Sequence, residues 1–344
     1  MDANRQTYDI KLTGKTVKTS KLVRKIFGLE AEIGLKNVKR NKKKYLATVF
    51  SLVISIVLFL SVTYFTDNLK KSLSMSQNDL KYDIQIYSTQ VEKEDLTDYT
   101  KLDHVTKSTI IEEASLVALI EPEEVPDHLK NQLQAEDGKY HYNVMLHGLD
   151  PESFETYAEQ VGVDAKEFTN QDTPRAIVID QITYEDGRTG KFIETKSIQS
   201  EVGRKVNLFT MPIGDMENEQ PESEVVGRVQ VGALTDQVAM GIHTVAIGGV
   251  NLIVPQATMD SLLANAAIEV TPYVYLNSSD PMATQTAIED RKDSNLHVFN
   301  LYQQRQQDEQ MIMLMSVFTY GFITLISFIS IANIFNTIST SISL

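Results

Sequence analysis

The sequence predicts an α+β membrane protein in which two transmembrane helices flank a two-lobed extracytoplasmic α/β domain with an inserted β-rich lobe. Three observations lead to this prediction. Residues 45–66 and 311–344 of the 344-residue chain carry no charge. Basic residues gather before the first uncharged segment. The region between the two segments alternates short strand-like and helix-like patterns.

The first crossing is predicted at residues 45–66 (YLATVFSLVISIVLFLSVTYFT). A helix of this length measures about 33 Å and spans a hydrocarbon core of roughly 30 Å. Lysines at 42–44 precede it, and Tyr64 and Phe65 stand where an outer aromatic belt would lie. A signal peptide would have a shorter apolar core nearer the N-terminus. The core helix of a soluble protein would rarely lack charge over such a length.

The second crossing is predicted at residues 311–331, where the sequence is again apolar. From Ala332 onward, Asn, Thr and Ser alternate with apolar residues. This pattern favours packing against other membrane helices, and a simple anchor with a ragged end is the alternative. The candidate packing residues are Asn333, Asn336, Thr337 and Thr340.

Charge is strongly segregated along the chain. Residues 1–44 hold 13 basic and 4 acidic side chains, whereas residues 67–310 hold 19 basic and 42 acidic ones, a net charge of −23. The basic end predicts a cytoplasmic N-terminus at the plasma membrane, with 67–310 outside the cell. The acidity of the outer part argues against nucleic acid as a partner. The absence of cysteine excludes disulfides and thiolate metal sites, and favours a Gram-positive bacterium.

The cytoplasmic segment 1–44 is predicted to contain an amphipathic helix at 21–41. Apolar residues there recur at helical spacing, basic residues fill the other face, and a break is expected near Gly28 or Gly34. Such a helix beside a crossing tends to lie in the headgroup layer. A solvated helix without a partner is the alternative. The apolar positions include Leu29, Ile33, Leu35 and Val38.

The region 67–310 is predicted to be one folded domain between two helical stalks, 67–80 and 301–310. Its first lobe would combine 67–172 with 249–300, and a β-rich lobe, 173–248, would be inserted into it. The predicted first-lobe strands are 84–88, 106–120 (one long strand or two short ones), 142–149, 252–254, 273–277 and 296–300. The predicted helices are 92–99, 151–161, 256–266 and 281–292. The predicted strands of the inserted lobe are 176–180, 205–210, 225–234 and 243–247, with a loose acidic loop at 215–224.

No catalytic motif is present. The sequence lacks a P-loop, an H-E-x-x-H motif and a G-x-S-x-G motif. On one strand, His141 and His147 would lie on the same face but about 20 Å apart, too far to share a metal ion. The other histidines are His104, His128, His243 and His297. We therefore expect no catalytic, cofactor-binding or metal-binding residues, and no enzyme activity.

Several stretches resemble one known family. Residues 35–48 (LKNVKRNKKKYLAT) lead directly into the first crossing, and AIVID (176–180), GRKVNL (203–208), VVGRV (225–229) and LIVP (252–255) follow in order. Together with 329–344 (ISIANIFNTISTSISL), they resemble permease subunits of MacB/FtsX-type ABC transporters. In that resemblance the outer part is a MacB-like core domain, and the last helix opens an FtsX-like membrane domain. The resemblance covers roughly residues 30–344.

The resemblance implies a permease that works with a separate cytoplasmic ABC ATPase, in the lipid bilayer, with a second permease copy or half. Leu29, Ile33, Leu35 and Val38 would then lie near the ATPase, and the stalks would act as levers. Exported or released substrates would be amphipathic compounds, antimicrobial peptides or lipoproteins. Two more membrane helices follow in the family, so the chain is expected to be a fragment from the second half of a double-length permease. A membrane-anchored extracellular binding or sensing protein is the alternative.

Overall fold

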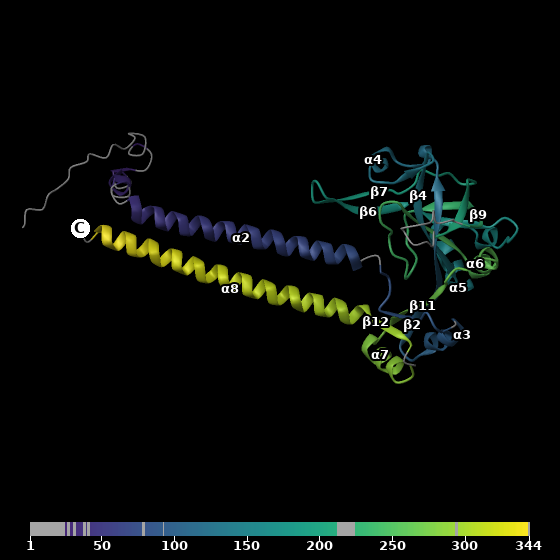
Figure 1. Ribbon diagram of the computed structural model, residues 1–344. Helices are drawn as coiled ribbons and strands as arrows, with labels where there is room; N and C mark the ends of the chain where they lie inside the picture. The colour runs from purple at the N-terminus through teal and green to yellow at the C-terminus, as the bar shows by residue number, and fades with distance from the viewer. Residues whose placement is uncertain are drawn as a thin grey trace, which may run out of the picture. The chain divides into compact units, whose positions relative to one another are not determined.

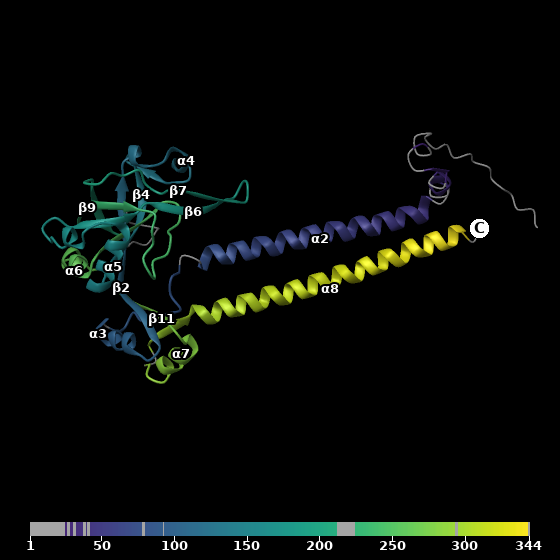
Figure 2. The ribbon, with the colours of Figure 1, turned by 180° about the vertical axis from the view of Figure 1, so that it is seen from behind.

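The computed structural model of the chain is shown in Figure 1, and from behind in Figure 2. The structure describes residues 25, 28–29, 32–36, 39, 42–77, 80–91, 93–211, 224–292 and 295–342. The chain divides into two units, which we call the helical unit (Met1–Lys71 and Gln310–Leu344) and the folded domain (Ser72–Glu309). Each is described by itself.

Two long helices, α2 (Lys42–Gln77) and α8 (Leu301–Ile342), dominate the helical unit. Their stretches Val49–Leu73 and Leu301–Ala332 are long and apolar enough to cross a membrane, and almost none of these residues is buried within the protein. The two helices run antiparallel beside one another (Figures 1 and 2), and Ser51 Oγ lies 3.2 Å from Ser330 Oγ. The chain therefore has two membrane-length helices that flank a sheet domain, as the sequence predicts.

The N-terminal segment is helical wherever it is described between Lys25 and Lys39. Gly28 has a φ of +84°, which is consistent with the predicted helix break near this glycine. The expected stalk at 67–80 is helical as far as Gln77, and Leu80 is no longer helical. Residues 1–20 and the acidic loop at 215–223 lie outside the described residues.

Four strands form the first lobe of the folded domain. Their order is β12-β1-β11-β2, and every neighbouring pair is antiparallel. The helices α3 and α7 and the 3-10 helix η1 follow β1 and β11 in the chain, which gives the β-α-β-β-α-β arrangement of split βαβ folds. We call this the split-βαβ lobe. Its elements are β1 (Ile84–Tyr87), α3 (Lys93–Leu96), η1 (Thr97–Lys101), the first half of β2 (Val105–Ile120), β11 (Thr271–Ser278), α7 (Pro281–Glu289) and β12 (His297–Asn300).

The second lobe is a six-stranded barrel. Its strands pair in the closed order β2-β8-β9-β5-β10-β4-β2, with parallel pairs at β5–β9 and β10–β4. The strands are the second half of β2, β4 (Lys139–Leu149), β5 (Arg175–Ile179), β8 (Lys205–Thr210), β9 (Val225–Thr235) and β10 (Gly249–Pro255). The barrel lobe also carries η2 (Pro122–Glu124), α4 (Asp127–Lys130), β3 (Ala135–Glu136), α5 (Pro151–Val161), η3 (Ala165–Phe168) and α6 (Gln256–Leu263).

Three apolar cores hold the domain. Alternate residues of the barrel strands, such as Leu116, Val144 and Leu252, fill the barrel interior. A second core lies on the outer face of the barrel and includes Ile111, Phe154 and Tyr275. The third core fills the space between the split-βαβ sheet and its helices.

The structure corrects the predicted division into lobes. Strands β5, β8 and β9 come from the range 173–248, yet they are hydrogen-bonded into one barrel with β4 and β10. The predicted strand at 243–247 is irregular, and instead its first residue, His243, uses its carbonyl to accept a bond from Asn251 Nδ2. A hairpin of β6 (Gln181–Asp186) and β7 (Lys191–Lys196), which the sequence analysis did not identify, projects from the barrel (Figures 1 and 2).

Gly241 allows the loop after β9 to approach the face of Tyr275. Its φ is +86°, and an added Cβ would overlap the Tyr275 ring. We expect Gly241→Ala to lower the free energy of unfolding by about 3 kcal/mol, because left-handed strain and a steric clash add. Gly138 has a similar φ of +79° but open space around it. Gly138→Ala should therefore cost only about 1 kcal/mol. Denaturant unfolding of the detergent-solubilised chain measures both, and equal losses would contradict the close approach.

Candidate functional site: the hinge and the collar

Strand β2 links the two lobes as one continuous element. Residues 105–113 of β2 pair with β11, and residues 111–120 pair with β4. Residues 111–113 therefore have a neighbouring strand from each lobe, and we call them the hinge. The only other chain connection between the lobes within the described residues is the segment between α6 and β11. A relative movement of the lobes must bend β2 at this place.

Asp150 fastens β2 to the barrel lobe at Ile110, one residue before the hinge. Its Oδ2 accepts a hydrogen bond from the Ile110 backbone N–H at 2.9 Å, and its own N–H donates to the Ile110 carbonyl at 3.1 Å. Its Oδ1 also accepts from the Ser153 N–H at 3.0 Å, which caps α5. The sequence favours this cap, because Asp followed by Pro at the first helical position is a strong helix start. One carboxylate thus joins strand and helix.

Polar contacts cluster on the face of the hinge that carries the Glu112 side chain. The Glu112 carboxylate forms an ion pair with the Lys93 ammonium of α3 at 3.3 Å. It also accepts a hydrogen bond from the Gln256 side-chain amide of α6. Burial raises the pKa of the Glu112 carboxyl above its ordinary value, and the Lys93 charge offsets part of that rise. Glu112 sits where the same face of β2 changes from the third core to the barrel interior. The two lobes therefore meet through polar contacts here, and the apolar packing is interrupted.

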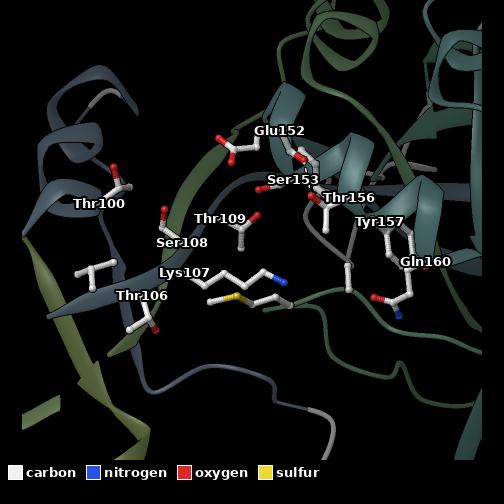
Figure 3. Close-up of a pocket in the computed structure, with 14 residues that line it drawn as sticks. Thr100, Thr106, Lys107, Ser108, Thr109, Glu152, Ser153, Thr156, Tyr157 and Gln160 are labelled. Atoms are coloured by element: carbon white, nitrogen blue, oxygen red, sulfur yellow. Dashed lines mark hydrogen bonds between the residues drawn. The ribbon is translucent and has the colours of Figure 1, made fainter. Parts of the chain in front are cut away.

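A cleft of about 260 Å³ opens beside the hinge, between β2 and α5 (Figure 3). One wall is the edge of β2, with Thr106, Ser108 and Thr109, and the other is α5, with Glu152 and Thr156. The lining is rich in hydroxyl groups. This cleft can take a small polar molecule between the two lobes.

Two side chains give the cleft its character. The Lys107 side chain lies along it and brings in the one ammonium group among the lining residues (Figure 3). The Tyr157 hydroxyl donates to the Gln237 carbonyl at 2.6 Å, and burial raises the pKa of this hydroxyl, so it stays a neutral donor.

The two chain segments that connect the domain to α2 and α8 are tied to each other, and we call residues 80–83 and 300–305 the collar. The backbone N–H groups of Leu301 and Tyr302 both donate to the Asp83 carbonyl, at 2.8 and 3.2 Å. Arg305 Nη2 donates to the Leu80 carbonyl at 2.9 Å. Asn300 caps α8 by accepting from the Gln303 N–H at 2.8 Å. These bonds hold the two segments side by side.

The collar is also packed into the second core. Leu80, Tyr82 and Leu301 are buried there with the hinge residue Ile111 and with Tyr275. The Tyr82 and Tyr275 rings lie 4.8 Å apart between centroids, and burial raises the pKa of Tyr82 to about 12. One apolar core therefore contacts both connecting segments and the hinge.

The residues singled out from the sequence lie elsewhere in the chain. Leu29 and Ile33 are helical and 54% and 52% exposed, and Leu35 is half-buried, whereas Val38 lies outside the described residues. The four packing candidates are in the last turns of α8, and their side chains lie outside the described part. Sequence reasoning did not identify Asp150, Glu112 or the collar. Only Asp150 carried a local signal, the Asp-Pro pair that starts α5.

Comparisons with known proteins find similar solved structures but no matching family or curated protein. No family model matches it, and no curated protein matches it. Among solved structures, it is similar to the periplasmic region of MacB from Actinobacillus actinomycetemcomitans, with 11% identity, coverage of 67% of this chain and 94% of that one, and a TM-score of 0.32.

It is also similar to the extracellular domain of the noncanonic ABC-type transporter YknZ from Gram-positive bacteria, with 10% identity, coverage of 63% and 99%, and a TM-score of 0.28. Both TM-scores are low, so neither likeness defines a function for this chain.

Replacing Asp150 tests the fastening of the hinge. Asp150→Ala removes a helix cap and leaves the Ile110 N–H unpaired, so we expect a loss of about 2–3 kcal/mol in unfolding free energy. Asp280 is a matched control, because it also precedes a proline and caps its helix through the Ala283 N–H. Asp280→Ala should cost about 1 kcal/mol. Hydrogen exchange of the Ile110 amide should accelerate only in Asp150→Ala, and unchanged exchange would contradict the role of Asp150.

Proposed function

We propose that this chain is a permease subunit of an ABC-type transporter in the plasma membrane of a Gram-positive bacterium. In this proposal 45–66 and 311–331 cross the bilayer, the N-terminus is cytoplasmic, and 67–310 is extracellular. A separate cytoplasmic ATPase hydrolyses ATP, and the permease converts that cycle into movement of the extracellular domain. The movement exports or releases amphipathic compounds, antimicrobial peptides or lipoproteins.

The collar is the observation that carries the proposal. Helix α8 runs without a break from the collar into its apolar stretch, and α2 ends only three residues before Leu80. An α-helix transmits displacement along its axis because its backbone bonds are internal and stiff. A shift of either helix therefore acts on residues that are tied to each other and packed against the hinge. This arrangement supports a role in which membrane helices move an outer domain.

The cytoplasmic side supports an ATPase partner. Leu29 and Ile33 expose apolar side chains on a helical segment of a strongly basic region. Exposed apolar side chains on a helix favour contact with a partner protein or a membrane surface. We propose that Leu29, Ile33, Leu35 and Val38 lie at the ATPase contact.

The end of α8 is proposed as a contact between membrane helices. Asn333, Asn336, Thr337 and Thr340 would pack against further helices, including those of a second permease copy or half, because side-chain amides and hydroxyls form hydrogen bonds between helices in lipid.

A membrane-anchored binding or sensing protein is the second candidate function. The hydroxyl-lined cleft between the lobes favours it, because a ligand there would contact both sides of the hinge. An ATPase that co-purifies with the chain distinguishes the two, since only the permease requires one.

The ATPase contact is tested by charge insertion. In the native membrane, a Leu29→Asp and Ile33→Asp double variant should recover about tenfold less ATPase on co-purification than the wild type. Gly34→Asp is the control, because it inserts one negative charge in the same helical segment at a position with open space around it. If the wild-type chain recovers no ATPase, the permease proposal is wrong. If the double variant recovers as much as Gly34→Asp, the contact lies elsewhere.

The lever role is tested by a helix break. Ser72→Pro removes one backbone bond of α2 and clashes with the preceding turn, whereas Ser72→Ala keeps the helix. The chain lacks cysteine, and the Val202 side chain is 60% exposed. A Val202→Cys variant therefore takes one spin label per copy. In the intact transporter, ATP should change the label-to-label distance with Ser72→Ala, and Ser72→Pro should abolish that change. An equal ATP response in both variants would refute the lever.

A further inference from the structure

A second cavity, of about 370 Å³, is lined by Glu113. It lies where β2 passes from the split-βαβ lobe into the barrel lobe. Glu113 pairs with Thr271 of β11 on one side and with His147 of β4 on the other. The volume falls within the range of small-molecule sites, which begins at roughly 300 Å³. The cavity is separate from the hydroxyl-lined cleft and shares no lining residue with it.

The walls of this cavity are mainly apolar. Met145, Met211 and Ile268 contribute flexible or branched apolar side chains, and Tyr273 contributes an aromatic ring. Tyr273 is held by neighbouring rings: its centroid lies 5.4 Å from that of Tyr87 and 5.9 Å from that of Tyr275. A fixed aromatic ring beside methionines suits an apolar body, and its face also attracts a cation.

The charged residues that line the cavity are all acidic. Glu113 and Glu269 line it, and no lysine, arginine or histidine does. The Glu113 side chain is only 14% exposed, and its nearest basic atom among the described residues is His147 Nδ1, at 3.2 Å. The Nδ1 atom is buried and has no hydrogen bond of good geometry. A positive partner stabilises a poorly solvated carboxylate, because it offsets the lost hydration.

His147 faces Glu113 with only one ring nitrogen, because the other ring nitrogen is bonded to Asn251. Asn251 Nδ2 donates to the His243 carbonyl at 2.8 Å, which leaves Asn251 Oδ1 to face His147 Nε2 at 3.0 Å. The Nε2 atom must therefore carry the proton. The Nδ1 atom is therefore the part of His147 that faces Glu113. On the side of the cavity, Glu113 meets no basic residue, so a cationic ligand there would not compete with a lysine, arginine or histidine that lines the cavity.

We infer that this cavity binds a small organic ammonium group with an apolar body. The ammonium would lie between Glu113 and the Tyr273 ring, and the apolar body would contact Met145, Met211 and Ile268. The same chemistry is offered by a free amine or quaternary ammonium compound and by a lysine side chain of a peptide. The inference deepens the proposed function, since such a ligand would be a transported substrate, but the binding itself does not require the ATPase.

The test is calorimetric titration of the full chain in a neutral maltoside detergent. Benzyltrimethylammonium should bind saturably, and phenylacetate, which has the same ring and the opposite charge, should not bind. Glu113→Gln should weaken the binding of benzyltrimethylammonium about five- to tenfold, and Tyr273→Leu about threefold. Glu155→Gln is the matched control, because it removes an exposed carboxylate that lines neither cavity, and it should leave the affinity unchanged.

A lysine peptide separates the two sources. Acetyl-Gly-Lys-Gly-amide is titrated against acetyl-Gly-Gln-Gly-amide, and tighter binding of the lysine peptide than of benzyltrimethylammonium assigns the site to a protein ligand. If Glu113→Gln unfolds, the Tyr273→Leu and Glu269→Gln variants carry the comparison. Equal affinity for phenylacetate, or wild-type affinity in the carboxylate variants, overturns the inference. These binding results do not depend on recovery of the ATPase. The co-purification experiment therefore tests the proposed function independently of the ligand.

Discussion

The pairing of β2 with two different partners is the constraint on which the folded domain depends. Because β2 is a single strand of 16 residues, its side chains alternate without interruption from one lobe into the other. One face contributes Ile110 to the third core and then Leu116 to the barrel interior, and the opposite face contributes Ile111 to the second core. A shift of β2 by one residue would invert all three cores at once. The register of this strand therefore fixes both lobes together.

The hinge combines this fixed register with an interruption of the apolar packing between the lobes. Glu112 and Glu113 are consecutive, so they point to opposite faces of the sheet, each at the border of an apolar core. Each keeps 14% of its side chain exposed and has a specific polar neighbour, Lys93 or His147. Polar contacts at a border exchange for water at little cost, whereas continuous apolar packing across it would resist separation. The carboxylates thus place the weakest packing where β2 changes partners.

Local signals explain what the sequence could predict, and long-range strand pairing explains what it could not. Helix α5 was predicted with its observed bounds, and local signals are present at both ends: Asp150 and Pro151 at its start, and Gly162, with a φ of +83°, at its end. The bounds of β8 were also predicted, and β2 was anticipated as one long strand or two short ones. The lobe boundary was misplaced because the pairs β5–β10 and β8–β2 join strands from 173–248 to strands outside this range, and no local pattern records pairing between distant segments. Residues 243–247 have an apolar pattern, but without a partner strand they form a loop. The carboxylate-lined cavity likewise depends on contacts between distant strands.

The collar explains why displacement of the connecting segments would reach the hinge. Three of its bonds end on the backbone carbonyls of Asp83 and Leu80, which cannot rotate away as side-chain acceptors can. Lys81 Nζ adds a bond to the Val238 carbonyl at 2.8 Å, in the loop that Gly241 brings against Tyr275. Close-packed cores resist compression, so the second core passes a displacement on to Ile111. The nearest part of the domain that can yield is the polar border at Glu112 and Glu113, beside both cavities. A ligand bound at either cavity would in turn oppose that movement, which makes binding and domain movement reciprocal.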